Sequence, residues 1–394
     1  MMRFDVLVVG GGMTGACLAL GLAHLTQGAM SIALVESHVA QPNTHPGFDS
    51  RSIALAHGTA QTLASLGVWA SLSALAEPLR RIHVSDQHHA GMTEIDAKEQ
   101  GLSALGYVVE LEPVGAQLHA MLERESSITL FCPNTVKQLT QQASSVQVLL
   151  DDGVEIETRL LVAADGADSF CAQQLGLSLT THSFEQTAVI ANIGLSQPHC
   201  GQAFERFTAA GPLALLPMSD QRMSLVWCLS TERAQTLLNS SDVDFQNALQ
   251  AEFGWRLGRL ASVGTRASYP LALRYRERII THRAVVVGNA AQALHPIAGQ
   301  GFNLALRDVA DLVEIIVANW QQGADVGEYR MLSRYRQRRE PDRTAIMTLT
   351  ASMVHLFSND WLPLRLGRNL GLAMMDNVSA FKAPLLRRTL GVQR

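Results

Sequence analysis

The sequence has few cysteines and little net charge. Its 394 residues include five cysteines, an odd number without C-x-x-C spacing, which argues against a metal cluster and against a disulfide framework. We therefore expect no metal and a reducing, cytoplasmic compartment. The net charge of -4 gives no reason to expect a nucleic-acid partner. Internal repeats and low-complexity tracts are absent as well.

Charged residues are scarce, at 17% of the chain, whereas 47% of the residues are hydrophobic. This composition is typical of a globular protein that buries a large core. Because one domain has about 150 residues, the length predicts two domains.

What the sequence does contain is a glycine cluster between an apolar run and a helical pattern. Residues 6–9 are apolar without alternation, which suits a parallel strand covered on both faces. Gly10, Gly12 and Gly15 then complete G-x-G-x-x-G. The first glycine allows a tight turn, the second lets backbone approach a pyrophosphate, and the third lets helix pack on strand. The helix that follows points its free N–H groups at the phosphates.

A second apolar run, residues 31–35, ends in Glu36, 21 positions after Gly15. An acid at this spacing accepts hydrogen bonds from ribose hydroxyls and argues against a 2′-phosphate. A signal peptide or membrane span would also begin with an apolar run. However, Asp5 precedes this run, glycines interrupt it, and no small-residue cleavage site follows. Strand, glycines, helix and acid together predict a nucleotide-binding turn.

The middle of the chain departs from alternating strands and helices. A strand at 145–150, an Asp-Asp-Gly turn and a returning strand at 154–158 predict an inserted β-meander, and a separate buried strand follows at 160–164. From residue 188 to about residue 280, short runs separated by turn residues predict an antiparallel sheet, which forms the second domain.

Several polar and aromatic positions have two interpretations. Arg51 lies across a phosphate or ring system, or is a solvated surface charge. Asp165 and Gly166 follow a buried strand and form either a plain turn or part of the site. Aromatic and apolar side chains of the antiparallel sheet either fill a core or line a substrate pocket. The candidate substrate contacts are Phe207, Leu215, Trp227 and His295.

A third buried strand, residues 284–287, leads into a proline-containing loop and a second helix N-terminus. This predicts a second anion site. A ligand that touches both glycine turns must be long, so a dinucleotide with a ring system fits better than a mononucleotide. The candidate residues in this stretch are Gly288, Asn289, Pro296, Gly299, Gln300, Gly301, Phe302 and Asn303.

Together these motifs resemble single-component FAD-dependent aromatic hydroxylases, and more narrowly the ubiquinone-biosynthesis hydroxylases. The similarity spans almost the whole chain. It is carried by the glycine motif with Glu36, by Asp165-Gly166, by residues 288–303, and by Phe48-Asp49-x-Arg51, Phe204-Glu205-Arg206-Phe207, Gly211-Pro212-Leu213-Ala214, Leu216-Pro217-Met218 and residues 367–372.

The resemblance implies an α/β fold with a Rossmann-like FAD-binding domain, whose parallel sheet carries the β-meander. An antiparallel-sheet substrate domain and C-terminal helices complete it. The boundaries that we expect are 1–75, 101–180 and 281–350 for the FAD-binding domain, 76–100 and 181–280 for the substrate domain, and 351–394 for the helices.

The resemblance also implies where the cofactor binds. The ADP part of FAD is expected at Gly10, Gly12, Gly15 and Glu36, with Arg51 near the cofactor. Asp165 and Gly166 are expected beside the pyrophosphate and the nicotinamide path, and the ribityl chain and ring along residues 288–303. Two departures from the family are Asn289, commonly Asp, and Ala172, commonly Arg. The second leaves the NAD(P)H-binding residues unassigned, and catalytic residues are unassigned too.

The implied reaction is hydroxylation of a polyprenyl phenol, with 2-octaprenyl-6-methoxyphenol as the expected substrate. NAD(P)H passes a hydride to the flavin, O₂ adds to give a peroxyflavin, and one oxygen is transferred to the ring. Other functions stay open: another ring hydroxylase of the pathway, a flavin-dependent prenyl-chain reductase, or a flavin-bearing scaffold in a ubiquinone-biosynthesis assembly. An NAD-dependent dehydrogenase would leave residues 288–303 unexplained.

The C-terminal segment 361–394 is basic and apolar. It holds six cations against one acid, Asp376, a net charge of +5, interleaved with leucines and methionines. Either a final helix packs on the FAD domain with a solvated basic face, or the segment meets the inner face of the cell membrane as a peripheral contact. No stretch is long and apolar enough to span a bilayer.

Overall fold

The computed structural model describes residues 1–39, 51–87, 91–296, 299–357 and 390–391. Most of the expected C-terminal region 351–394 therefore lies outside the described residues, including nearly all of the basic segment. Within the described residues, no helix is both long and apolar enough to cross a bilayer.

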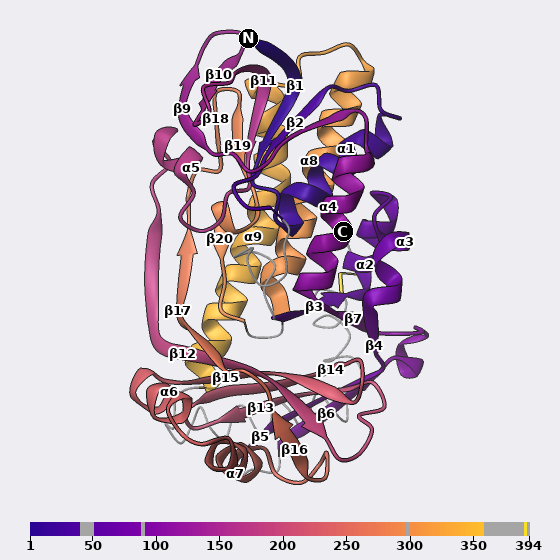
Figure 1. Ribbon diagram of the computed structural model, residues 1–394, viewed down its shortest axis with the longest axis vertical. Helices are drawn as coiled ribbons and strands as arrows, with labels where there is room; N and C mark the ends of the chain where they lie inside the picture. The colour runs from indigo at the N-terminus through magenta and orange to yellow at the C-terminus, as the bar shows by residue number, and fades with distance from the viewer. Residues whose placement is uncertain (40–50, 88–90, 297–298, 358–389, 392–394) are drawn as a thin grey trace.

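The first sheet is built around the N-terminal strand. Its parallel strands run in the order β19 (Ala284–Val286), β11 (Glu155–Ala163), β1 (Met2–Val9), β2 (Ile32–Val35) and β8 (Ile128–Phe131), and β18 (Ile280–Thr281) is antiparallel at the edge. Val6 to Val9 are almost completely buried because both faces of β1 are covered. Helices α1 (Met13–Leu25), α4 (Leu111–Arg124) and α8 (Gln300–Gln321) lie beside this sheet (Figure 1).

The β-meander joins the same sheet. β9 (Val136–Gln141) pairs with β10 (Val146–Leu150), which pairs with the first half of β11. The two strands expected at 154–158 and 160–164 are one strand, so that expectation was wrong. The strand is continuous because β1 pairs with it from Ile156 to Ala163, while β10 and then β19 share its other edge.

The second sheet is larger and almost entirely antiparallel. Its order is β20 (Gln292–Ala293), β17 (Ala267–Tyr275), β12 (Thr180–Leu195), β15 (Arg222–Ser230), β14 (Gly211–Met218), β13 (Gln202–Thr208), β5 (Arg81–Asp86) and β6 (Met92–Asp96), with β16 (Leu260–Val263) beside β12. β5 reaches this sheet from early in the chain and pairs in parallel with β13. An α/β protein with a parallel and an antiparallel sheet is the predicted fold class, which is thus confirmed.

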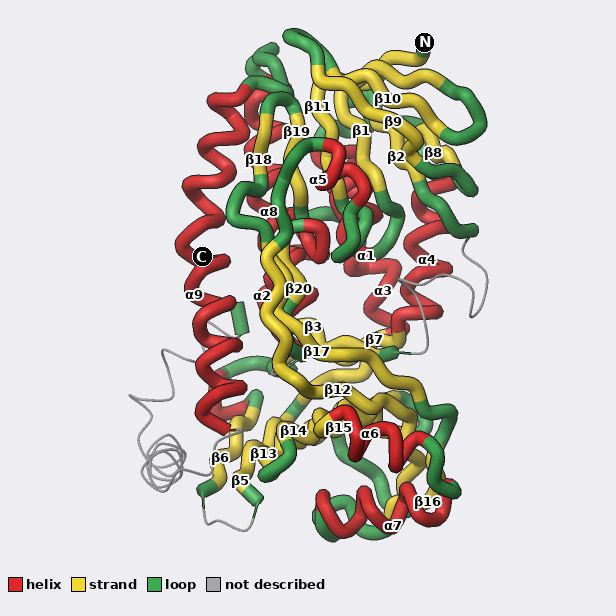
Figure 2. Tube along the Cα trace, turned by 90° about the vertical axis from the view of Figure 1, so that its left-hand side faces the viewer, coloured by secondary structure: helices red, strands yellow, loops and turns green. Residues whose placement is uncertain are grey.

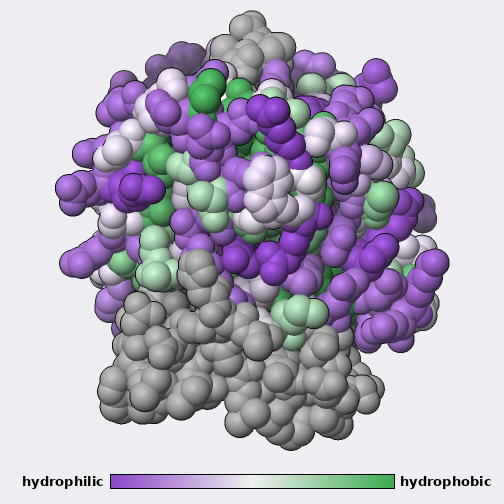
Figure 3. All heavy atoms as spheres, turned by 90° about the horizontal axis from the view of Figure 1, so that it is seen from below, coloured by the Kyte–Doolittle hydropathy of each residue, from purple (hydrophilic) through white to green (hydrophobic). Residues whose placement is uncertain are grey.

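Two helices cover the outer face of the second sheet. α6 (Thr231–Leu238) and α7 (Asp242–Phe253) lie below it in Figure 1, within a region that the sequence pattern had assigned to strands. Their start signals are Ser230 and Ser241, whose hydroxyls accept backbone N–H groups three residues on. The face seen from below is covered mainly by hydrophilic side chains (Figure 3), because the apolar side of each helix faces the sheet.

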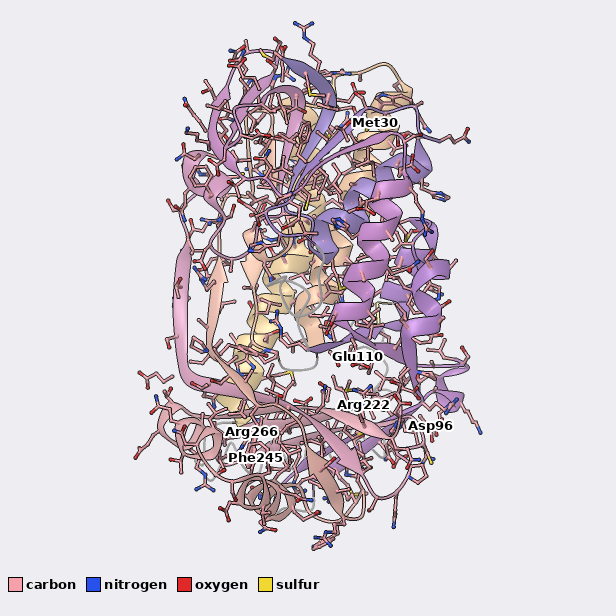
Figure 4. The ribbon with its side chains drawn as sticks, viewed as in Figure 1. Met30, Asp96, Glu110, Arg222, Phe245 and Arg266 are labelled. Carbon is pink, nitrogen blue, oxygen red and sulfur yellow. The ribbon has the colours of Figure 1, made fainter. Side chains whose placement is uncertain are left out.

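A third, small sheet lies between the two large ones. It consists of β3 (Ser52–Ala56), β7 (Gly106–Glu110) and β4 (Ala76–Leu79). Helices α2 (His57–Ser65) and α3 (Trp69–Leu72) follow β3. Glu110, at the end of β7, forms an ion pair with Arg222 of the second sheet at 2.9 Å, and Figure 4 shows the two side chains pointing toward one another.

Three long elements join the large sheets. β12, β17 and α9 (Tyr329–Phe357) run from the region of the first sheet to the second (Figure 2). α9 is fixed to α8 by buried ion pairs of Arg339 with Asp308 at 2.8 Å and with Asp311 at 3.1 Å. The three long elements and the ion pairs between α8 and α9 thus hold the two large sheets on either side of a common cavity.

Candidate active site

A cavity of about 1360 Å³ lies between the two large sheets. Its lining comes from the carboxyl ends of β1 and β2, from the starts of α1 and α8, and from the upper face of the second sheet. Typical ligand pockets have volumes of about 300–1000 Å³. This cavity is therefore large enough for more than one small molecule.

The glycine motif forms one end of the cavity. A Cβ atom on Gly10 would lie 2.5 Å from the Ala164 carbonyl oxygen, and one on Gly15 would lie 1.9 Å from the Gly10 oxygen. These two glycines are required by the packing of strand and helix. A Cβ atom on Gly12 would meet nothing within 4 Å. Gly12 is also the N-cap of α1 and makes no side-chain cap, so the first N–H groups of the helix face open space.

Glu36 lies in the same end, just beyond β2. Its Oε2 accepts the Gly11 N–H at 2.5 Å, and its Oε1 accepts the His38 N–H at 2.8 Å and the Ser37 hydroxyl at 3.1 Å. These three bonds fix a carboxylate at the cavity wall. Such a group suits recognition of hydroxyls on a sugar.

A second helix N-terminus faces the same cavity. Gly299 caps α8 in the left-handed region, with φ of +59°, and no side chain caps this helix either. Gln300, Gly301 and Phe302 line the cavity. Two uncapped helix N-termini thus point at one space, which favours an elongated ligand with negative charge.

Asn303 lies at the start of the same helix, but its side chain bonds to other protein groups. Its Oδ1 accepts the Ala56 N–H at 2.8 Å and the Thr59 hydroxyl at 2.7 Å, and its Nδ2 donates to the carbonyls of Ala54 and Gly299 at 2.9 and 2.6 Å. All four bonds join protein segments. Asn303 therefore holds β3 and α2 against the α8 loop, although it also lines the cavity.

Of the remaining predicted cofactor residues, some line the cavity and others only pack protein segments together. Arg51, Gly166, Asn289 and Pro296 line the cavity, and so does Asp165. The Asp165 carboxylate accepts the Ser169 hydroxyl at 2.5 Å and the Cys171 N–H at 3.0 Å, which fixes the start of α5 (Phe170–Gln174). Gly15 and Gly288 do not line it. A Cβ atom on Gly288 would lie 2.8 Å from Thr14 Cγ2, so Gly288 permits close packing on α1.

The opposite end of the cavity is the upper face of the second sheet. One residue from each of seven adjacent strands, β6, β5, β13, β14, β15, β12 and β17, contributes to a row across this face. The row is Thr93, Val84, Glu205, Ala214, Val226, Ile190 and Ala267, each opposite the next in strand register. All seven line the cavity. Because side chains alternate along a strand, their chain neighbours point to the other face, toward α6 and α7.

Three predicted substrate contacts, Leu215, Trp227 and His295, are wrong, the first two because of this alternation. Leu215 and Trp227 lie on the outer face, in the core beneath the helices, and the Trp227 ring meets Phe245 at a centroid distance of 6.0 Å. His295 is fully buried against Phe184, outside the cavity lining, and burial lowers its pKa to about 4. Phe207 does line the cavity, where it packs with Val84 and Met353.

Several lining residues carry no local sequence motif that marks them as part of a site. At the glycine end these are Thr14, Ser37, His38, Asn134 and Thr135, and at the sheet end Ile82, Val84, Thr93, Ile95, Thr350 and Met353. The strand pattern of residues 81–86 was a usable signal for the β5 members. Nothing in the local pattern of α9 indicates that Thr350 and Met353 reach the cavity.

The geometry fits FAD. The gap at Gly12, the two uncapped helix starts and the fixed Glu36 carboxylate suit the phosphates and the ribose of an adenine dinucleotide. The remaining volume of the cavity lies against an apolar sheet face, where an aromatic substrate would fit.

Comparison with known proteins agrees with this geometry. The chain matches the FAD binding domain family over residues 3–350. It is 35% identical over 393 residues to the ubiquinone hydroxylase UbiL of Rhodospirillum rubrum, covering 98% of this chain and 89% of the relative. It is 31% identical to the 3-demethoxyubiquinol 3-hydroxylase of Escherichia coli, covering 98% of both chains.

Solved structures support the fold. The p-nitrophenol 4-monooxygenase PnpA from Pseudomonas putida DLL-E4 matches with a TM-score of 0.80 over 99% of both chains, at 17% sequence identity. The resemblance stated from the sequence is therefore confirmed. This chain belongs to the FAD-binding family that includes the ubiquinone-biosynthesis hydroxylases, and it is a flavoprotein monooxygenase.

Proposed function

We propose that this monooxygenase hydroxylates the aromatic ring of a polyprenyl phenol in ubiquinone biosynthesis, using NAD(P)H and O₂. The observation that carries the proposal is one continuous cavity with a dinucleotide-type end and an apolar sheet face. The two relatives named above, a ubiquinone hydroxylase and a 3-demethoxyubiquinol 3-hydroxylase, align over nearly the whole chain and support the pathway.

FAD, when bound, supplies the redox chemistry: it takes a hydride from NAD(P)H and delivers one oxygen atom of O₂ to the ring. The protein would hold its phosphates at the N-termini of α1 and α8 and its ribose at Glu36. Arg51, Asp165, Gly166 and Asn289 line the same cavity and would contact the rest of the cofactor. The mainly apolar wall formed by β5, β13, β14 and β15 would exclude water from the ring and orient it.

The substrate that we propose is 2-octaprenyl-6-methoxyphenol. The alternatives are another ring of the same pathway, or the prenyl chain itself in a reductase. Purified protein should be incubated with NADH or NADPH, isotopically labelled O₂ and 2-methoxy-6-prenylphenol, a short-chain form of the substrate. Mass spectrometry should find one labelled oxygen on the ring. A product that gains hydrogen without the label would instead show a prenyl-chain reductase.

The cofactor assignment is tested separately with Gly12→Val. Since a Cβ atom at this position meets nothing within 4 Å, the variant should fold but lose most of its FAD, because the side chain fills the space for the pyrophosphate. Gly12→Ala, with a smaller side chain, should retain more flavin. Full flavin occupancy of a folded Gly12→Val protein would refute the placement of the phosphates.

A membrane contact through the basic segment 361–394 is part of the same proposal. A polyprenyl substrate resides in the bilayer, so cationic and apolar side chains near anionic lipid would assist its delivery. Liposome flotation decides this point. Replacing Arg365, Arg368, Arg387 and Arg388 by Gln should weaken binding to anionic vesicles, and equal binding by both proteins at low and high salt would argue for a packed helix. An assembly with other ubiquinone-biosynthesis proteins stays a prediction.

A further inference from the structure

The apolar sheet wall contains one carboxyl group. Glu205 lies in the middle of β13, opposite Val84 of β5 on one side and Ala214 of β14 on the other. Beyond Ala214 the row continues with Val226 and Ile190. The Glu205 side chain therefore enters the cavity from a surface of aliphatic side chains.

Within the described residues, Glu205 differs from the other acids that line the cavity. Glu36 accepts three hydrogen bonds, Asp165 accepts two, and Asp168 forms an ion pair with Arg274. No hydrogen bond or ion pair with another described residue engages Glu205. An unpaired carboxyl on an apolar surface is unfavourable for folding, so its presence in a ligand cavity indicates a partner supplied by the ligand.

The surroundings of Glu205 set its protonation. Burial raises its pKa to about 7. The titratable neighbour that senses its charge is Cys228 of β15, whose pKa is raised in turn, first by burial and then by Glu205. From α9, the residues that line the cavity are Leu349, Thr350 and Met353, none of which carries a charge. Near neutral pH, Glu205 can thus exchange a proton with a ligand.

We propose that Glu205 binds the phenolic hydroxyl of the substrate and acts as the base that accepts its proton. This inference rests on the proposed function. The phenol O–H bond breaks, a new O–H bond forms on a Glu205 oxygen, and the electron pair stays on the phenolic oxygen. The oxygen then donates electron density to the ring positions ortho and para to it, where the new C–O bond forms.

The pKa values of the phenol and of Glu205 determine when the proton moves. A phenol has an ordinary pKa of about 10, above that of Glu205. The ground-state complex is therefore a hydrogen bond from phenol to carboxylate, and the proton moves as the ring is oxidised. Because Val84 and Ala214, its partners on the adjacent strands, are aliphatic, a hydrogen bond to Glu205 also orients the ring.

The first test compares two probes: 2-methoxy-6-prenylphenol and its methyl ether, which lacks the hydroxyl. The FAD-loaded wild-type protein should bind the phenol more tightly than the ether by about tenfold or more at pH 8, since hydrogen bonds to charged groups are strong. Glu205→Gln should bring the two affinities to within about twofold. The matched control is Glu94→Gln on β6, two strands from β13 in the same sheet, where the side chain is 41% exposed and faces away from the cavity.

The second test is the pH profile of hydroxylation. Turnover by the wild-type protein and by Glu94→Gln should rise as the pH passes about 7. Glu205→Gln should lose most of its hydroxylation and this rise, yet keep its FAD content. If the wild-type protein does not hydroxylate the phenol, the proposed function fails. If the wild-type protein hydroxylates it and Glu205→Gln keeps both the preference for phenol and the pH profile, only the role of Glu205 fails.

Discussion

The two ends of the cavity differ in the groups that line them: one presents backbone N–H groups and the other presents side chains. At the dinucleotide end, backbone N–H groups of α1 and α8 face the cavity, and glycines provide the space. At the sheet end, side chains of one strand face form the wall. The first end thus depends on backbone conformation and on hydrogens in place of Cβ atoms. The second depends on side-chain size and charge, so substitutions should act differently at the two ends.

The largest effect is expected at Gly15. Valine there would place Cβ 1.9 Å from the Gly10 oxygen, a backbone atom that cannot move without separating α1 from β1. The loss should be comparable with the whole stability of a domain, about 5–15 kcal/mol. Soluble yield and circular dichroism should show an unfolded chain, whereas Gly12→Val stays folded. A folded Gly15→Val protein would contradict the role of this glycine in packing.

At the sheet end, the face on which a side chain lies determines whether its substitution lowers stability or changes ligand affinity. Trp227→Ala should lower the free energy of unfolding by about 3–5 kcal/mol, because it opens a void beneath α7. Affinity for the phenol probe should not change. Val226→Ala, one position earlier but on the cavity side, should have the opposite pattern, with a small loss of stability and a measurable change in probe affinity. Denaturant titration and probe binding separate the two, and weaker probe binding by Trp227→Ala alone would reverse the assignment of the faces.

Asn303 tests the dinucleotide end for a side-chain contribution. Asn303→Leu leaves the Ala56 N–H and the carbonyls of Ala54 and Gly299 without their partners, at about 1–3 kcal/mol for each buried group left unsatisfied. We expect a total loss of about 2–4 kcal/mol, because relaxation restores part of these bonds. Gly301→Ala is the control, since its Cβ meets nothing within 4 Å. Thermal unfolding of the FAD-free proteins is the measurement, and equal stability of both variants would contradict the bracing role of Asn303.

The smallest effect depends on pH. Folding raises the pKa of Glu205 from 4.5 to about 7, so the folded state binds its proton more tightly than the unfolded state does. Glu205 therefore does not destabilise the folded protein below pH 4.5, where it is protonated in both states. Its ionisation lowers the free energy of unfolding as the pH rises through about 7. Glu205→Gln should be more stable than wild type by about 1–3 kcal/mol at pH 8, after allowance for partial exposure to the cavity. Urea unfolding at pH 8 and at pH 5 should show this gain shrinking, and a gain that is equal at both pH values would exclude the raised pKa.

The same comparison explains what could be predicted from the sequence. Gly10, Gly12 and Glu36 are readable because a local backbone motif fixes their positions relative to one another. The prediction that Leu215 and Trp227 line the cavity is wrong, because both faces of the second sheet are buried. The sequence pattern therefore does not show which face an apolar residue occupies. The site role of Glu205 is not readable from the sequence, because its isolation among aliphatic side chains depends on the pairing of β13 with β5 and β14.

The order of strands in the first sheet also governs when the protein acquires its cofactor during synthesis. β1 leaves the ribosome well before its neighbour β11, which begins at residue 155, and before β19 and the start of α8, which follow at residues 284 and 300. A nascent chain therefore carries the complete glycine motif long before it can hold a flavin. We therefore expect FAD to bind only after α8 has been synthesised, so ribosome-stalled chains that end before residue 300 should remain colourless.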